Sequence, residues 1–156
     1  MAVIELDTLI NAPIERCFLL SLSVDVHTLS TAHTQERAVA GIMSGRMKLG
    51  DTVTWRARHF GIWQQLTSKI TAYQYPTYFC DEMISGAFQS FRHEHHFIQQ
   101  LAGTRMKDVF YFESPLGLLG KLANGLFLKS YMSTLLAQRN LVIKKVAEGN
   151  EWKKFT

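Results

Sequence analysis

The segment Asp51–Gln74, DTVTWRARHFGIWQQLTSKITAYQ, decides the predicted fold, because apolar and polar side chains alternate along it on both sides of Phe60-Gly61. Alternation with a period of two predicts β-strands that are buried on one face. A short glycine-containing turn between two such runs predicts an antiparallel hairpin. Arg56 and Arg58 mark the water-facing side of the first strand, so Trp55 and its alternate neighbours are expected to point inward.

The period of two continues on either side of this hairpin. An extended run at 2–10 opens the chain, and later runs are bounded by glycine, aspartate or proline, as strands commonly are. Further strands are predicted at 36–43, 51–59, 62–74, 77–84, 88–99 and 104–113. The short connections between these runs favour antiparallel neighbours.

Two short helices are predicted between the first and second strands. Asn11-Ala12-Pro13 ends the opening strand, and proline is tolerated at an early helical position because no N–H is needed there. Apolar residues at helical spacing then predict one helix over 14–22 and another over 24–29.

A long amphipathic helix is predicted from Pro115 to about Ala147. The residues predicted to face water are Lys121, Lys129, Arg139 and Asn140. The arc predicted to face the sheet contains Leu119, Ala123, Leu126, Phe127, Ser130, Tyr131, Thr134, Ala137, Gln138, Leu141 and Val142. Because several of these residues are small, the helix is expected to leave space above the sheet.

Strands grouped in the middle of the chain, with helices towards its ends, indicate the α+β class. We expect a curved seven-stranded antiparallel sheet that grips the long C-terminal helix, with two short helices between strands 1 and 2. One such domain is predicted over residues 1–148, followed by a C-terminal tail at 149–156. An apolar cavity is expected between the sheet and the helix.

Composition excludes several other classes of protein. The 156 residues are 47% hydrophobic and 19% charged, which suits one soluble domain. The 17 basic residues are scattered, so nucleic-acid binding is not expected. No apolar run reaches the roughly 18 residues of a membrane span. The first residues lack a signal pattern, so a cytoplasmic location is expected.

Cys17 and Cys80 are expected to be buried free thiols. No sequence pattern favours a particular oligomeric state.

Several stretches also resemble a known superfamily. They are ARHFGIWQQLTSKITAYQYPTYFCDEM at 57–83, GAFQSFRHEHHF at 86–97, GTRMKD at 103–108 and SPLGLLGKLA at 114–123. In these stretches the chain resembles bacterial SRPBCC proteins, the START-like ligand-binding superfamily with a helix-grip fold. The resemblance implies a seven-stranded sheet around a deep hydrophobic cavity. It implies no particular ligand, because the superfamily includes sterol and lipid carriers, hormone receptors, and polyketide aromatases and cyclases.

Five titratable residues fall on the predicted concave face of the sheet: His59, Asp81, His93, His95 and Asp108. If neighbouring strands place a carboxylate beside an imidazole, Asp81 with His93 or His95 could act as acid and base on a polyketide-like substrate. The alternative is a structural ladder in which aspartate orients histidine and only positions a ligand. We favour the ladder, because structural networks also perturb titration.

The run His93-Glu94-His95-His96 also contains possible metal ligands. On a strand only alternate residues point together, so His93 and His95 can share an ion while Glu94 and His96 face the other way. A third ligand would have to come from Asp81, His59 or Asp108. We therefore expect no metal and no other cofactor.

The predicted ligand-binding residues combine inward positions of the strands with the inner arc of the long helix. They are Trp55, His59, Ile62, Leu66, Phe79, Asp81, Met83, Phe91, His93, His95, Met106, Asp108, Phe110, Ala123, Leu126, Phe127, Ser130, Tyr131 and Thr134.

Three functions are compatible with this prediction. The first is non-catalytic binding of a small hydrophobic molecule, such as a lipid, a sterol-like or a polyketide-like compound. The second is an aromatase or cyclase-type enzyme that uses Asp81 with His93 or His95. The third is a protein-interaction module without a ligand, which predicts a filled interior and an exposed apolar patch.

Overall fold

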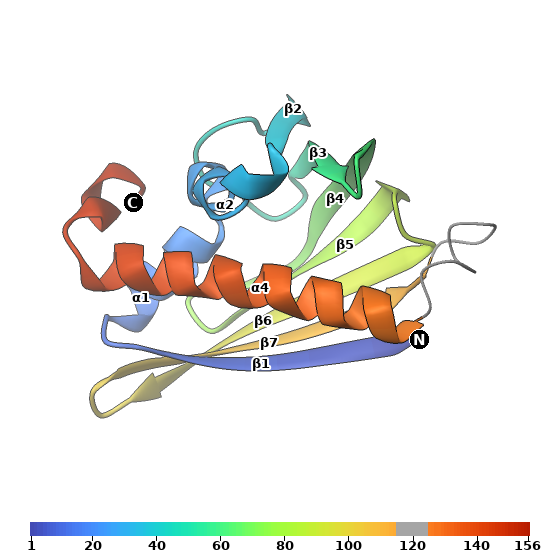
Figure 1. Ribbon diagram of the computed structural model, residues 1–156. Coiled ribbons are helices and arrows are strands. Elements are labelled where there is room, and N and C mark those ends of the chain that lie inside the picture. Colours follow the sequence, from blue (N-terminus) through green and yellow to red (C-terminus); the bar gives the residue numbers. More distant parts are fainter. Residues whose placement is uncertain (115–124) are drawn as a thin grey trace.

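The computed structural model describes residues 1–114 and 125–156, with side chains described from residue 127 onward in the second range (Figure 1). The elements are β1 (Ala2–Ile10), α1 (Ile14–Ser21), α2 (Val24–Ser30), the 3-10 turn η1 (Ala32–Thr34), β2 (Arg37–Gly41), β3 (Thr52–His59), β4 (Ile62–Gln74), β5 (Tyr78–Gly86), β6 (Ser90–Gln100), β7 (Gly103–Glu113), α4 (Gly125–Glu148) and the 3-10 turn η2 (Glu151–Lys154). Each predicted strand is found, with ends that differ by a few residues.

The seven strands form one antiparallel sheet in the order β1-β7-β6-β5-β4-β3-β2. Strands β2 to β7 follow each other as hairpins, and β1 pairs with β7 across the length of the chain. The sheet curves, and α4 crosses its concave side (Figure 1). The predicted α+β class and the predicted helix-grip architecture are confirmed.

The hairpin of β3 and β4 shows why local sequence sets this topology. Phe60 and Gly61 have φ values of 54° and 75°, and positive φ at both turn positions suits the right-handed twist of the flanking strands. The turn places Trp55 opposite Leu66, both on the inner face. Two register shifts between β4 and β5 then bend the sheet, as β-bulges do.

Helices α1 and α2 lie at one end of the sheet, beside the C-terminal half of α4 (Figure 1). Pro13 precedes α1, as predicted, and the hydroxyl of Ser23 caps α2 by accepting a hydrogen bond from the backbone N–H of Val26. Phe18 of α1 is fully buried and makes edge-to-face contacts with four aromatic rings. These rings are Tyr73, Tyr75, Phe79 and Phe97.

The predicted inner face of the long helix is wrong by about one residue position. Ser130, Thr134 and Ala137 are exposed, whereas Arg139 and Asn140, predicted to face water, are buried. A polar side chain on a helix commonly indicates exposure, but these two side chains are held inside by Asp108 on the sheet. The helix instead turns Leu128, Leu136, Ile143, Val146 and Ala147 inward, at helical spacing.

The last residues pack against the core instead of extending away from it. Trp152, in η2, and Phe155 are partly buried against the larger hydrophobic cluster. The guanidinium of Arg16 lies 3.9 Å from the centre of the Trp152 ring, a cation–π arrangement. Within the part of the chain that the structure describes, no helix is long and apolar enough to cross a membrane.

Candidate functional site

A cavity of about 480 Å³ lies between the inner face of the sheet and the helices α2 and α4. Volumes of this size are typical of small-molecule sites, and so is a lining that is mostly apolar with a few polar groups. Such a cavity is predicted from the sequence, but there its expected cause is the small size of residues on the helix. The helix lines it with large residues, among them Leu128, Met132 and Leu135, so the space comes from the curvature of the sheet.

Most of the predicted ligand-binding residues lie in the cavity wall. Those that line it are Trp55, His59, Ile62, Leu66, Phe79, Asp81, Phe91, His93, His95, Phe110 and Tyr131. The strand residues among them face inward because the alternation of β3 to β7 places them there.

The remaining predicted residues lie elsewhere. Met106 belongs to the hydrophobic core, and Met83 packs against the second core cluster. Phe127, Ser130 and Thr134 are exposed, because the inner face of α4 is rotated from the predicted one. Asp108 is buried behind the cavity wall, against His93 and His95. Ala123 lies outside the described residues, as does the side chain of Leu126.

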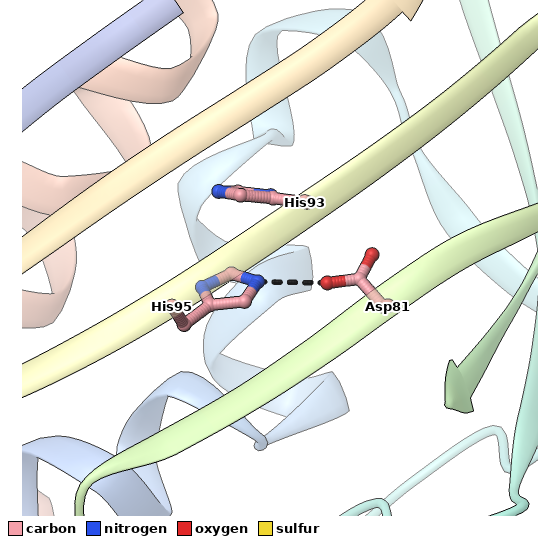
Figure 2. Close-up of side chains that lie close together, drawn as sticks. All are labelled: Asp81, His93 and His95. Carbon is pink, nitrogen blue, oxygen red and sulfur yellow. Dashed lines mark hydrogen bonds and ion pairs between the residues drawn. The ribbon is translucent and has the colours of Figure 1, made fainter. Parts of the chain in front are cut away.

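Asp81, His93 and His95 form one polar group in the wall (Figure 2). Asp81 and His93 are direct partners across β5 and β6, and His95 follows two residues later on the same face. His95 Nε2 donates a hydrogen bond to Asp81 Oδ1 at 2.7 Å, and the rings of His93 and His95 are 3.8 Å apart between centroids. The ring of Phe79 stacks on that of His95 at 4.0 Å between centroids, and His95 is buried.

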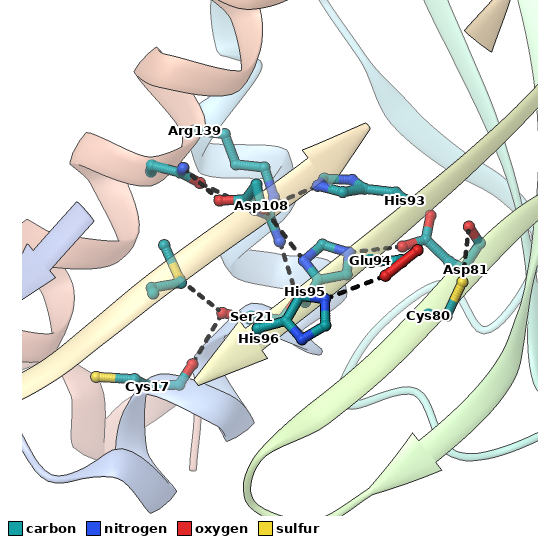
Figure 3. Close-up of polar contacts among 12 residues, drawn as sticks. Cys17, Ser21, Cys80, Asp81, His93, Glu94, His95, His96, Asp108 and Arg139 are labelled. Carbon is teal, nitrogen blue, oxygen red and sulfur yellow. Dashed lines mark hydrogen bonds and ion pairs between the residues drawn. The ribbon is translucent and has the colours of Figure 1, made fainter. Parts of the chain in front are cut away.

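Asp108 on β7 connects this group to α4 (Figure 3). Its Oδ1 accepts a hydrogen bond from His93 Nε2 at 2.8 Å, and its Oδ2 accepts one from Asn140 Nδ2 at 2.6 Å. Arg139 Nη1 donates to Asn140 Oδ1 at 3.0 Å and lies 3.6 Å from Asp108 Oδ1. The buried carboxylate therefore meets polar partners from both the sheet and the helix.

Burial and these partners set the titration of the group. Burial lowers the pKa of His93 to about 4, with a smaller contribution in the same direction from His95 and an opposing one from Asp108. Burial alone would raise the pKa of Asp108, but its contacts with His93 and His95 lower it well below the ordinary value. Burial alone would raise the pKa of Asp81 too, but its hydrogen bond to His95 and its electrostatic interaction with that ring lower it. His93 is thus neutral at pH 7, beside ionised aspartates.

A second polar group lies in the wall at β3, and sequence reasoning found only part of it. His59 Nδ1 and the Tyr131 hydroxyl share a hydrogen bond of 2.6 Å, and burial lowers the pKa of His59. The ring of His27 lies 4.2 Å from that of Trp55 and pairs with Glu36. His27 and Glu36 were missed, because neither lies in a pattern of alternating or helical polarity that points to a cavity.

Arg139 and Asn140 were the most important residues missed. Arg139 lines the cavity, and both side chains are buried. A polar pair on a helix indicates exposure unless its partner is known, and that partner, Asp108, lies on a strand more than 30 residues earlier in the chain. The available signal was Asp108 itself, which lies between Met106 and Phe110 on the inner face of β7 and therefore needed a buried polar partner.

The geometry defines a helix-grip protein with an apolar cavity and a buried histidine–aspartate network. No protein-family model and no curated protein matches the chain. Solved structures with the same fold include TTHA0849 from Thermus thermophilus, with 15% identity, a TM-score of 0.71, and coverage of 94% of this chain and 99% of that one.

Two further similar structures carry descriptions of different kinds. Ginseng major latex-like protein 151 from Panax ginseng has 15% identity and a TM-score of 0.66, with 95% of this chain and 98% of that chain covered. StfQ, a di-domain ARO/CYC protein of the steffimycin biosynthetic pathway, has 14% identity and a TM-score of 0.71, with 94% and 50% covered. At these identities the likeness shows the SRPBCC-type fold alone.

Proposed function

We propose that this protein binds a small, mainly apolar molecule in the cavity between its sheet and α4, and that Asp81, His93 and His95 bind the polar group of that molecule. The observation that carries the proposal is the 480 Å³ cavity with these three residues in its wall. An apolar wall supplies most of the binding free energy, and a few fixed polar groups set the orientation of the ligand.

The hydrogen bonds of the polar network hold its side chains in fixed orientations. Asp81 and His95 hold each other by a hydrogen bond, and Asp108 holds His93 from behind. Asp108 is in turn held by Asn140 from α4. Side chains that are positioned in this way lose little entropy when a ligand binds, which favours affinity.

Displacement of a fluorescent apolar dye tests the proposal. Anilinonaphthalene sulfonate should bind the folded protein with an increase in emission, and at least one compound in a panel of fatty acids, sterols and polycyclic phenols should displace it. Ala57 is buried in the cavity wall, so Ala57→Phe should fill the space and reduce dye affinity at least about tenfold. Ala137→Phe on the exposed face of α4 is the matched control and should leave the affinity unchanged.

Ser68→Leu, also in the cavity wall, provides a second blocking variant if Ala57→Phe does not fold. Thermal melting of each variant checks that a loss of binding is not a loss of structure. Equal dye affinity in the filled and control variants would contradict the proposal, because the dye would then bind outside the cavity.

A cyclase or aromatase-type activity is the second candidate. It is favoured by a neutral, buried His93 beside the Asp81–His95 pair, since a neutral imidazole can accept a proton. StfQ is described as an ARO/CYC protein, which fits this reaction class. Asp81→Asn and His93→Gln should then abolish turnover of a linear polyketide analogue while the melting temperature changes little. Turnover that persists in both variants would exclude this role for the network.

The third function, an interaction module without a ligand, predicted a filled interior. The cavity does not agree with that prediction.

A further inference from the structure

We propose that Asp81, His93 and His95 form a binding site for a divalent transition-metal ion, with an open coordination position that faces the apolar cavity. This inference goes beyond ligand binding as such and does not depend on it.

The three side chains are close enough to share an ion. Each offers one ligand atom, and these atoms all lie within 4.8 Å of one another (Figure 2). In a tetrahedral zinc site, with metal–nitrogen bonds of about 2.0 to 2.1 Å, donor atoms lie about 3.3 Å apart. Separations of up to 4.8 Å must therefore shorten by side-chain rotation for the three atoms to bind one ion. Asp81 supplies the third ligand that the sequence left open.

Asp108 lies beside both imidazoles on the side away from Asp81, and it accepts a hydrogen bond from His93 (Figure 3). His93 Nε2 donates to Asp108 Oδ1, which fixes the tautomer of that ring and leaves Nδ1 as its lone-pair nitrogen. Histidines that bind metals commonly donate their other N–H to a carboxylate, which orients the ring and makes it a better ligand. The arrangement of His93 and Asp108 has this form.

His95 gives an independent indication. Its Nδ1 is buried and has no hydrogen-bond partner within the described residues, although Asp108 Oδ1 lies 3.4 Å away. In the metal-free protein the ring proton is on Nε2, which donates to Asp81. If Nε2 coordinates a metal, the ring proton moves to Nδ1 and can be donated to Asp108. Metal binding would thus satisfy a buried atom that is otherwise costly to leave unpaired.

The charge and the ligand types define the class of ion. The network contains two carboxylates, of Asp81 and Asp108, and one guanidinium, of Arg139. Because the carboxylates outnumber the guanidinium, the network favours an added cation. Two imidazoles and one carboxylate suit zinc, iron(II) or cobalt(II) better than magnesium or calcium. Because all three ligands line the cavity, the remaining coordination position is available to an oxygen atom of the bound molecule.

Titration of untagged, EDTA-treated protein with zinc(II) and cobalt(II) tests the inference. We expect one equivalent of either ion to bind and cobalt(II) to give the visible absorption of a low-coordinate site. Asp81→Asn removes a ligand and should weaken binding at least as much as loss of a supporting carboxylate, which costs about 10-fold to 100-fold. Asp108→Asn should weaken it within that same range, about 10-fold to 100-fold.

His96→Gln is the matched control. His96 lies on the same strand as His93 and His95 but pairs with Glu94 on the opposite face, so its replacement should leave the affinity unchanged. Failure to bind a stoichiometric ion, or equal binding by Asp81→Asn and the unaltered protein, would overturn the inference. Dye binding measured in EDTA separates the two proposals, because a cavity that takes the dye without binding a metal leaves the proposed function intact.

Discussion

Arg139 Nη1 lies 3.6 Å from Asp108 Oδ1, and both side chains are buried where α4 crosses β7. Asn140 Nδ2 donates to the other oxygen of the same carboxylate. The long helix is therefore fixed to the sheet by a polar contact as well as by apolar packing. The same carboxylate supports His93 in the cavity wall, so the contact that positions the helix also positions the candidate site.

Replacement of Asp108 should be strongly destabilising. Asp108→Ala leaves the guanidinium of Arg139 buried without its counter-charge and is expected to lower the free energy of unfolding by about 3 to 5 kcal/mol. Asp7→Ala on the neighbouring strand is the control, because Asp7 pairs with Arg105 in water and its loss should change stability little. Urea unfolding of both variants measures the difference, and similar losses in the two would show that Arg139 does not depend on Asp108.

Stability of the metal-free protein should decrease as the pH falls from about 6.5 to 4. The pKa of His93 is about 4 in the fold and near 6.5 when unfolded, so within this window the unfolded chain binds a proton that the folded protein does not. Above pH 6.5 this difference in proton binding does not change the free energy of unfolding. At about pH 4 it has lowered that free energy by roughly 3 kcal/mol. Below it, protonation of Asp81 and Asp108, whose pKa values are lowered, adds a further loss.

His93→Gln isolates this effect in EDTA-containing buffer. The variant should show a flatter dependence of unfolding free energy on pH between about 6.5 and 4, by the same linkage. His59, whose pKa is also lowered by burial, accounts for part of the remaining slope, and His59→Gln measures that part. An unchanged slope in His93→Gln would mean that the imidazole of His93 is not kept neutral by the fold.

The strands could be predicted from sequence because their signal is local. In β3, Arg56 and Arg58 alternate with Val53, Trp55 and Ala57, and these three are buried. The face of α4 could not be predicted in the same way, because burial of Arg139 depends on a partner that only the tertiary structure supplies.

The candidate site could be predicted in part. Alternation placed Asp81, His93 and His95 on one face, whereas the distances between these side chains depend on the register between β5 and β6.

Gly103 should tolerate no side chain, for a steric reason. Its φ is 129°, and an added Cβ would lie 2.2 Å from the carbonyl oxygen of Ile10, at the junction of β1 and β7. Gly61 in the β3–β4 turn also has a positive φ, of 75°, but nothing lies within 4 Å of an added Cβ there. Gly61→Ala should cost about 1 to 2 kcal/mol for the backbone conformation alone. Gly103→Ala should cost clearly more, and equal melting temperatures would contradict the close approach.

Tryptophan fluorescence offers a way to locate a bound molecule. Trp55 is 9% exposed and lies in the cavity wall, with its ring tilted against that of His27. Trp63 is 42% exposed, lies outside the wall, and is covered by the guanidinium of Arg56 at 4.4 Å. Trp152 lies under Arg16 near the C-terminal end of the chain. The three indoles therefore report on different environments.

A compound that displaces the dye should change the emission of Trp55 and leave that of Trp63 and Trp152 nearly constant, because of the three indoles only Trp55 lines the cavity. Trp55→Phe should accordingly abolish the emission change on titration while retaining most of the affinity, since a ring still fills the position. Trp63→Phe is the matched control and should keep the full change. If Trp63→Phe lost the signal and Trp55→Phe kept it, the molecule would be bound outside the cavity.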